Sequence, residues 1–289
     1  MSPSPAQKVT ATEDIQKRAN QVFTGGISNG EYGLLPEEII AIDHGIGAKI
    51  WDTSGTEFID FSMAWGSCLI GHANSEVTNA VLKQVPQGSN FAFLNPNALC
   101  LGEKIKNCCP AVERLRFCAS GTEATMYCER IARGYTGRNK IMKFEGAYHG
   151  ASDTGVTSLF PKKLYEFPKP ESTGSKILDI ENKLLVSEYN NLAITKELVE
   201  KNANDLAAVI IEPLQRCTPP ESGFLEGVRK ICTNCKVLLI FDEVVTGFRL
   251  AYGGAQEYYG VIPDLVAYGK ALGGGYPIGA FGGKAKILD

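Results

Sequence analysis

The fold is decided by an apolar run that ends in two acids, Val237-Leu238-Leu239-Ile240-Phe241-Asp242-Glu243. An unbroken apolar run of this kind predicts a strand that is buried on both faces, as in a parallel sheet. The run Leu206-Ala207-Ala208-Val209-Ile210-Ile211 has the same character and leads into Glu212-Pro213. Such strands alternate with segments of helical spacing along the chain. The sequence therefore predicts an α/β fold whose mostly parallel central sheet is covered by helices.

This alternation extends outward from the two runs over most of the chain. Strands are expected at residues 114–118, 140–144, 184–187, 206–211, 237–241, 265–268 and 278–281. Helices are expected at residues 75–85, 97–108, 122–135, 195–202 and 223–232. Residues 1–45 are expected to form an arm with one helix, and a hairpin should follow with strands at 49–52 and 57–61. Residues 150–180 are rich in Pro, Lys, Ser and Gly and predict a long loop.

The composition excludes several classes of protein. The 289 residues are 44% hydrophobic, which is enough for a sizeable core and rules out a mainly disordered chain. The formal net charge of −3 argues against nucleic-acid binding, because phosphate neutralisation needs a surplus of Lys and Arg. No apolar run approaches the roughly 18 to 20 residues of a membrane-spanning helix. Residues 1–23 lack a signal-peptide core, so a cytoplasmic protein is expected.

The cysteines do not point to a metal site. The chain has nine of them, which fits reduced thiols in the cytoplasm. Cys232 and Cys235 form a C-x-x-C pair, but a zinc site needs about four ligands, and no second Cys pair or His pair stands nearby in the sequence. We therefore interpret this pair as structural and expect no metal.

Three of the expected strands are followed closely by charged residues that a buried strand does not need. Glu212, Asp242 and Lys270 each stand within two residues of such a strand end. Because ligands of open α/β sheets bind outside the carboxyl ends of the strands, we expect these three side chains to converge on one crevice. The alternative for each residue taken alone is a solvated charge in a loop.

Two further features belong to the same end of the sheet. Ser120-Gly121-Thr122 precedes the helix expected at 122–135, and free N–H groups at a helix start attract an anion. The alternative is an ordinary helix cap by Ser120. Tyr148-His149-Gly150 follows the strand at 140–144, and the Tyr148 ring is suited to lie against a planar ligand or to pack in the core.

An anion site, a carboxylate, an aromatic ring and a lysine together are what pyridoxal phosphate requires. The lysine binds this cofactor as a Schiff base, and the carboxylate pairs with the pyridine nitrogen so that the ring can accept electrons. A partly desolvated pocket lowers the pKa of the lysine, which lets it act as nucleophile and base. A nucleotide-binding α/β protein is the rival interpretation, but the glycine fingerprints of P-loops and dinucleotide-binding folds are missing.

Four segments, in order, resemble those of class III pyridoxal-phosphate-dependent aminotransferases. They are Cys118–Thr125 (CASGTEAT), Lys143–Gly150 (KFEGAYHG), Asp242–Arg249 (DEVVTGFR) and Gly269–Gly283 (GKALGGGYPIGAFGG). The run Gly254–Gly260 (GAQEYYG) is most similar to the glutamate-1-semialdehyde aminomutase branch. The resemblance implies the fold of fold-type I pyridoxal-phosphate enzymes and a homodimer.

The resemblance also implies a role for each site residue. Lys270 would hold the cofactor and shuttle the proton, and Asp242 would pair with the pyridine nitrogen, which makes these two the expected catalytic residues. The other residues expected to bind the cofactor are Ser120, Gly121, Thr122, Tyr148, Glu212 and Val244. Those expected to meet the substrate are Trp65 and His149. The reaction implied is transfer of an amino group between an amino acid or amine, as donor, and an oxo compound, as acceptor.

The sequence departs from the aminomutase pattern in three places. Tyr32 stands about where the aminomutase has an arginine that grips the substrate carboxylate. A Pro- and Lys-rich loop at residues 160–175 replaces a Gly-rich one, and Gln215 or Arg216 would take the place of an asparagine. These departures favour an aminotransferase, with the aminomutase as the alternative.

The resemblance predicts an uneven division of the chain. Residues 1–60 would form an N-terminal arm with a segment of the small domain, and residues 61–289 the large, cofactor-binding domain. The chain ends at Asp289, so the C-terminal small domain of the family is expected to be absent. A fragment that does not turn over substrate is a further alternative.

Overall fold

The computed structural model describes residues 5–28, 40–160, 167–171 and 179–289, with side chains from Asp14 onward. The chain forms two compact units, Met1–Ser89 and Asn90–Asp289. The first unit ends at Ser89, and the division into residues 1–60 and 61–289 that the sequence suggests stays a prediction. The first unit therefore includes the helix expected at 75–85.

The first unit contains a long helix and a small antiparallel sheet. Its helices are α1 (Pro5–Val22), η1 (Thr24–Gly26), α2 (Met63–Gly66), α3 (Ser75–Gln84) and η3 (Val85–Gln87). Its strands, in sheet order, are β1 (Ile42–Ile46), β2 (Lys49–Asp52) and β3 (Glu57–Ile59). The antiparallel pairing of β2 and β3 confirms the predicted hairpin. Its turn is closed by Asp52 Oδ1, which accepts hydrogen bonds from Ser54 N and Thr56 N at 2.9 and 2.8 Å. Strand β1 was not expected from the sequence, since its segment is short, interrupted by Gly45 and mostly exposed.

The second unit alternates strands and helices as expected. Its strands are β4 (Arg114–Cys118), β5 (Lys140–Phe144), β6 (Leu184–Ser187), β7 (Leu206–Ile211), β8 (Leu238–Asp242), β9 (Leu265–Tyr268) and β10 (Gly279–Gly283). Its α-helices are α4 (Pro96–Cys108), α5 (Gly121–Thr136), α6 (Asp153–Val156), α7 (Leu192–Asn202), α8 (Phe224–Asn234), α9 (Ala255–Tyr258) and α10 (Ala285–Leu288). The 3-10 helices are η4 (Ile180–Asn182) and η5 (Lys270–Gly273).

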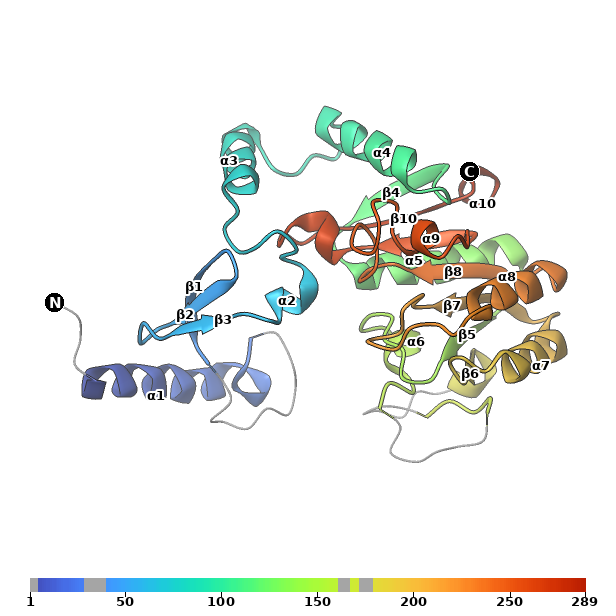
Figure 1. Ribbon diagram of the computed structural model, residues 1–289, viewed down its shortest axis with the longest axis horizontal. Coiled ribbons are helices and arrows are strands. Elements are labelled where there is room, and N and C mark those ends of the chain that lie inside the picture. The colour runs from blue at the N-terminus through green and yellow to red at the C-terminus, as the bar shows by residue number, and fades with distance from the viewer. Residues whose placement is uncertain (1–4, 29–39, 161–166, 172–178) are drawn as a thin grey trace. The chain divides into compact units, whose positions relative to one another are not determined.

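The strands of the second unit form one sheet in the order β4-β10-β9-β8-β7-β5-β6 (Figure 1). The pairs β9–β8, β8–β7, β7–β5 and β5–β6 are parallel, and β10 runs antiparallel to β9 and β4. The prediction of a mostly parallel sheet is therefore confirmed. Parallel pairing places the carboxyl ends of β7, β8 and β9 side by side at one edge of the sheet.

Helices cover both faces of this sheet. On one face, Val209, Ile211 and Phe241 pack with buried residues of α7 and α8. On the other face, Ala208 and Ile210 pack with buried residues of α5. Every residue of β7 is buried, which explains why its sequence is an unbroken apolar run.

Removing a large side chain from the centre of the sheet should destabilise the fold strongly. Ile210 is fully buried in β7, so we expect Ile210→Ala to lower the free energy of unfolding by about 2–5 kcal/mol. Ile262 is 48% exposed in the same unit, and Ile262→Ala should change it by only about 0.5 kcal/mol. Denaturant unfolding of both variants measures the difference. Equal losses of unfolding free energy would contradict a core packed on both faces of the sheet.

Candidate active site

The sheet brings Asp242, Glu212 and Lys270 to one edge. Asp242 ends β8, Glu212 directly follows β7, and Lys270 follows β9 after one glycine, on strands that are neighbours in the sheet. Burial lowers the pKa of the Lys270 amine, and the carboxylates of Asp242 and Glu212 oppose that shift. Both carboxylates therefore lie within electrostatic reach of the Lys270 amine.

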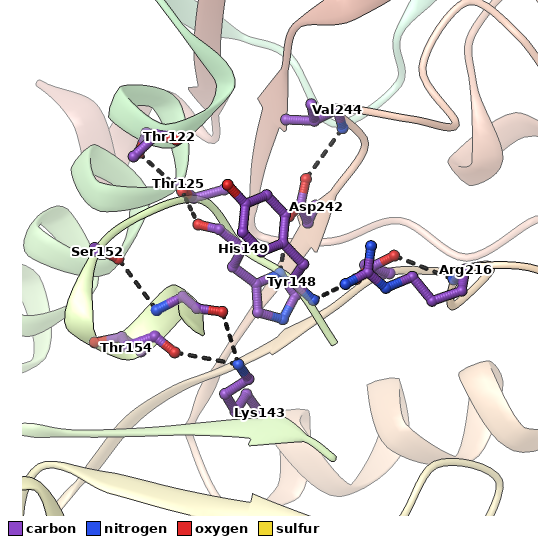
Figure 2. Close-up of polar contacts among 12 residues, drawn as sticks. Thr122, Thr125, Lys143, Tyr148, His149, Ser152, Thr154, Arg216, Asp242 and Val244 are labelled. Carbon is purple, nitrogen blue, oxygen red and sulfur yellow. Dashed lines mark hydrogen bonds and ion pairs between the residues drawn. The ribbon is translucent and has the colours of Figure 1, made fainter. Parts of the chain in front are cut away.

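Asp242 is a buried carboxylate with two polar partners. Its Oδ2 lies 2.8 Å from Nδ1 of His149, and its Oδ1 accepts a hydrogen bond of 3.1 Å from the backbone N–H of Val244 (Figure 2). The Asp242 side chain is only 5% exposed. These two contacts fix the plane of the carboxylate, because one comes from the loop after β5 and the other from the turn after β8.

The ring of His149 is turned toward Asp242. Its side chain is fully buried, with Nδ1 on Asp242, and its Nε2 has no hydrogen-bond partner among the described residues. The main chain of His149 is fixed as well, because its carbonyl accepts from Thr125 Oγ1 at 2.7 Å and its N–H donates to the carbonyl of Gly155 at 3.2 Å. The structure thus shows a contact of His149 with Asp242, and the substrate contact expected for His149 stays a prediction.

Glu212 is also buried, and it holds the surrounding loops. Its Oε1 accepts from the N–H of Tyr148 at 2.7 Å, and its Oε2 accepts from the N–H of Arg216 at 3.2 Å. Tyr148 follows β5 and Arg216 follows β7, so one carboxylate ties together two loops at this edge of the sheet. Tyr148 is 40% exposed as a residue, and the guanidinium carbon of Arg216 lies 5.5 Å from the centre of its ring.

The start of α5 combines a cap with open N–H groups. Ser120 is the N-cap, and its Oγ accepts from the N–H of Glu123 at 3.1 Å, so the capping alternative holds for this hydroxyl. The N–H groups of Gly121 and Thr122 precede the first helical hydrogen bond, and no partner for them occurs in the described part of the chain. Two backbone donors at the positive end of a helix dipole are therefore available for an anion.

The start of α5, at Gly121 and Thr122, packs tightly against its neighbours. A Cβ atom on Gly121 would lie 2.8 Å from a methyl group of Val244, so only glycine fits there. A Cβ on Gly150 would lie 2.7 Å from Cα of Thr122, and the N–H of Ala151 donates to Thr122 Oγ1 at 3.3 Å. The start of α5, the turn after β8 and the loop after β5 thus meet at this point.

Lys270 has the conformation and the charge environment of a reactive amine. Its backbone φ is +44°, a left-handed value that is unfavourable for a residue with a Cβ atom. Burial is the largest cause of the lowered pKa of its amine. A lowered pKa increases the fraction of neutral amine at pH 7, which is the nucleophilic form.

A second buried lysine, Lys143, was not singled out from the sequence. Its Nζ donates to the carbonyls of Thr154, Gly155 and Thr157 at 3.2, 2.9 and 2.7 Å, and the residue is fully buried. Burial lowers its pKa to about 7. The signal that could have found it is a lysine inside the apolar strand 140–144. Because its amine is saturated by three carbonyls, Lys143 holds a loop and is not a free nucleophile.

The remaining expectations concern other parts of the chain. Trp65 lies in the first unit and is 55% exposed, and its role toward a substrate stays a prediction. Tyr32 and most of the loop at residues 160–175 lie outside the described residues. Within the described ranges, no group of three or more His, Cys, Asp or Glu side chains is arranged to hold a metal ion. No helix among those same residues is long and apolar enough to cross a membrane.

With this geometry, the chain belongs to the class III aminotransferase family. Residues 35–289 match the family model described as Aminotransferase class-III. Among curated relatives, the glutamate-1-semialdehyde 2,1-aminomutase of Geotalea daltonii is 42% identical over 280 residues, covering 95% of this chain and 65% of that protein. The aminomutase of Salinibacter ruber is 41% identical, covering 94% of this chain and 63% of that protein.

Solved structures share the fold. An omega-transaminase from Sphaerobacter thermophilus is 36% identical with a TM-score of 0.92, covering 96% of this chain and 65% of that chain. A structure described as a transaminase with PLP bound is 29% identical with a TM-score of 0.89, covering 99% of this chain and 66% of that chain. The expected fold-type I architecture is thereby confirmed, and the chain spans about two thirds of the length of these relatives.

The buried amine of Lys143 should make stability depend on pH. The folded protein binds this proton with a pKa of about 7, whereas the unfolded chain has the ordinary value of 10.5. The unfolded state therefore holds more protons between these values, and the free energy of unfolding should rise with pH by up to about 1.4 kcal/mol per unit.

The measurement compares wild type with Lys143→Met by denaturant unfolding at several pH values between about 7.5 and 9.5, inside the window in which the Lys143 proton is lost on folding. The difference between the two free energies should grow in favour of wild type as pH rises. A difference that is flat or that shrinks with pH would show that Lys143 keeps its proton in the folded state.

Proposed function

We propose that this chain carries the cofactor-binding part of an enzyme that uses pyridoxal 5'-phosphate to move an amino group between an amino acid or amine and an oxo compound. The observation that supports this most directly is the buried Asp242–His149 pair at the end of β8, facing the charge of Lys270 after β9. The chain spans about two thirds of its relatives, so turnover by this chain is part of the proposal.

The residues present fit this cofactor. Free N–H groups at Gly121 and Thr122 suit a phosphate, and a half-exposed aromatic ring at Tyr148 suits a planar ring. Asp242 offers a buried carboxylate to a protonated ring nitrogen, and Lys270 offers an amine with a lowered pKa. Lys143 is the rival amine, but it is fully buried and already donates to three carbonyls.

When bound, pyridoxal phosphate supplies an electron sink that stabilises the carbanion formed when the substrate loses a proton. Lys270 would attach the cofactor, and its amine, once released, would take the proton from the substrate carbon and return it to another atom. Asp242 would keep the ring nitrogen protonated, because a charge left uncompensated in a buried site is unfavourable.

His149 and Glu212 would act through other residues. His149 holds Asp242 in one orientation, so the carboxylate cannot turn away from the ring nitrogen. Glu212 fixes the main chain at Tyr148, and with it the height of the aromatic ring over the site. Neither residue needs to touch the substrate for these roles.

A glutamate-1-semialdehyde aminomutase is the second candidate, and the names of two curated relatives at 41–42% identity favour it. A mutase moves the amino group within one substrate and needs no external acceptor. Assays with and without an added oxo acid therefore separate the two candidates. A homodimer stays part of the proposal for either reaction.

Replacing Asp242 should slow the amino transfer without preventing attachment of the cofactor. The variant Asp242→Asn removes the negative charge but keeps the size of the side chain. We expect the half-reaction with an amino donor to slow by about 100-fold or more, as for loss of one preorganised electrostatic group.

The control is Asp205→Asn, which removes an acid of the same unit that is 70% exposed. The half-reaction is followed by the change in cofactor absorbance after mixing with the donor. Wild-type rates in Asp242→Asn, or an equal loss in Asp205→Asn, would contradict the assigned role of Asp242.

A further inference from the structure

We propose that Arg216 is a carboxylate-binding residue and that it selects amino acids and oxo acids over simple amines as substrates. The inference rests on the proposed amino-transfer function, which it deepens by naming the substrate class. Neither the family match nor the names of the relatives assign a role to this residue.

The main chain of Arg216 adopts a left-handed conformation that is uncommon for a residue with a Cβ atom. The N–H and C=O groups of Gln215 and Thr218 exchange hydrogen bonds of 3.1 and 2.8 Å, so Arg216 and Cys217 form the tip of a tight turn. Arg216 has φ of +57°, and glycine is preferred at such a turn position because it has no Cβ atom. An arginine held in this conformation beside a candidate active site points to a function for its side chain.

The turn is anchored so that the side chain has a defined direction. Glu212 Oε2 accepts from the N–H of Arg216, and Gln215 Nε2 donates to the carbonyl of Glu145 at 2.8 Å. The Nε of Arg216 donates to the carbonyl of Gly146 at 3.3 Å. These contacts tie the turn to the segment before Tyr148, and the guanidinium group comes to lie over the Tyr148 ring. Figure 2 shows Arg216 beside Tyr148.

The outer part of the guanidinium is open. Only Nε is used, and no partner for the two terminal amino groups occurs in the described part of the chain. No carboxylate among the described residues forms an ion pair with Arg216, since Glu212 is occupied by backbone N–H groups. A planar fork of N–H donors without an acid partner matches the geometry of a carboxylate.

The charge of Arg216 also reaches the reacting centre. It lowers the pKa of Lys270, in the same direction as burial and against Asp242 and Glu212. Arg216 follows β7 and Lys270 follows β9, so a carboxylate bound to Arg216 would lie at the same edge of the sheet as the Lys270 amine. The Arg216 guanidinium would therefore orient an amino acid by its carboxylate, which takes no part in the amino transfer.

The alternative is that Arg216 only stabilises the loop by stacking on Tyr148. The two roles differ in their effect on binding. A purely structural Arg216 predicts an unchanged dissociation constant for a carboxylate when the guanidinium is removed, whereas a binding role predicts a weaker complex. Tm does not separate the roles, because Arg216→Gly removes the contacts with Gly146 and Tyr148 in either case while glycine relieves the left-handed backbone.

The test measures carboxylate binding directly and needs no turnover. Propionate is titrated into the full chain and followed by ligand NMR, for wild type, Arg216→Met, Arg216→Gly and the control Arg116→Met. Arg116 is an exposed arginine on strand β4, outside the candidate site. We expect the dissociation constant of propionate to rise about tenfold or more in both Arg216 variants, the loss expected when charge-assisted hydrogen bonds are removed, and to stay unchanged in Arg116→Met.

A matched pair of donors gives the second readout. In the half-reaction of the cofactor-loaded protein, Arg216→Met should raise KM for alanine and leave ethylamine unaffected. An unchanged dissociation constant in the Arg216 variants, or an equal rise of this constant in Arg116→Met, would overturn the assignment. If neither donor reacts with wild type while propionate still binds through Arg216, the amino-transfer function fails and the carboxylate site stands.

Discussion

The contact between Asp242 and His149 is the constraint on which the candidate site depends. It joins the end of β8 to the loop after β5, although β7 lies between these strands in the sheet. The same loop carries Tyr148, and it packs through Gly150 against the start of α5. A buried carboxylate without such a partner would be costly, so the pair stabilises the fold while it orients the acid. One polar contact thereby fixes the relative positions of an acid, an aromatic ring and an anion-binding helix start.

Burial lowers the pKa of two lysines in the second unit, Lys143 and Lys270, but their surroundings differ. Lys143 is fully buried, and its amine donates hydrogen bonds to three carbonyls in and next to α6. These contacts hold that segment in place. Lys270 is only partly buried and stands at a left-handed backbone position after β9. A lowered pKa alone therefore does not identify a reactive lysine, whereas access and free hydrogen-bonding capacity do.

The sequence predicted most of the second unit because its strands are buried on both faces and read as apolar runs. Glu212, Asp242 and Lys270 could be found for the same reason, since a charge at the end of such a run stands out. The contact between His149 and Asp242 could not be predicted, because it joins residues far apart in the sequence. The position of the Arg216 guanidinium could not be predicted either. It depends on a left-handed turn conformation that is unusual for arginine.

The most direct test of this account is reduction with borohydride in the presence of pyridoxal phosphate, followed by peptide mapping of the labelled lysine. The account predicts a label on Lys270 and none on Lys143, although burial lowers the pKa of both amines. A label on Lys143 or on another lysine, or no label at saturating cofactor, would contradict it.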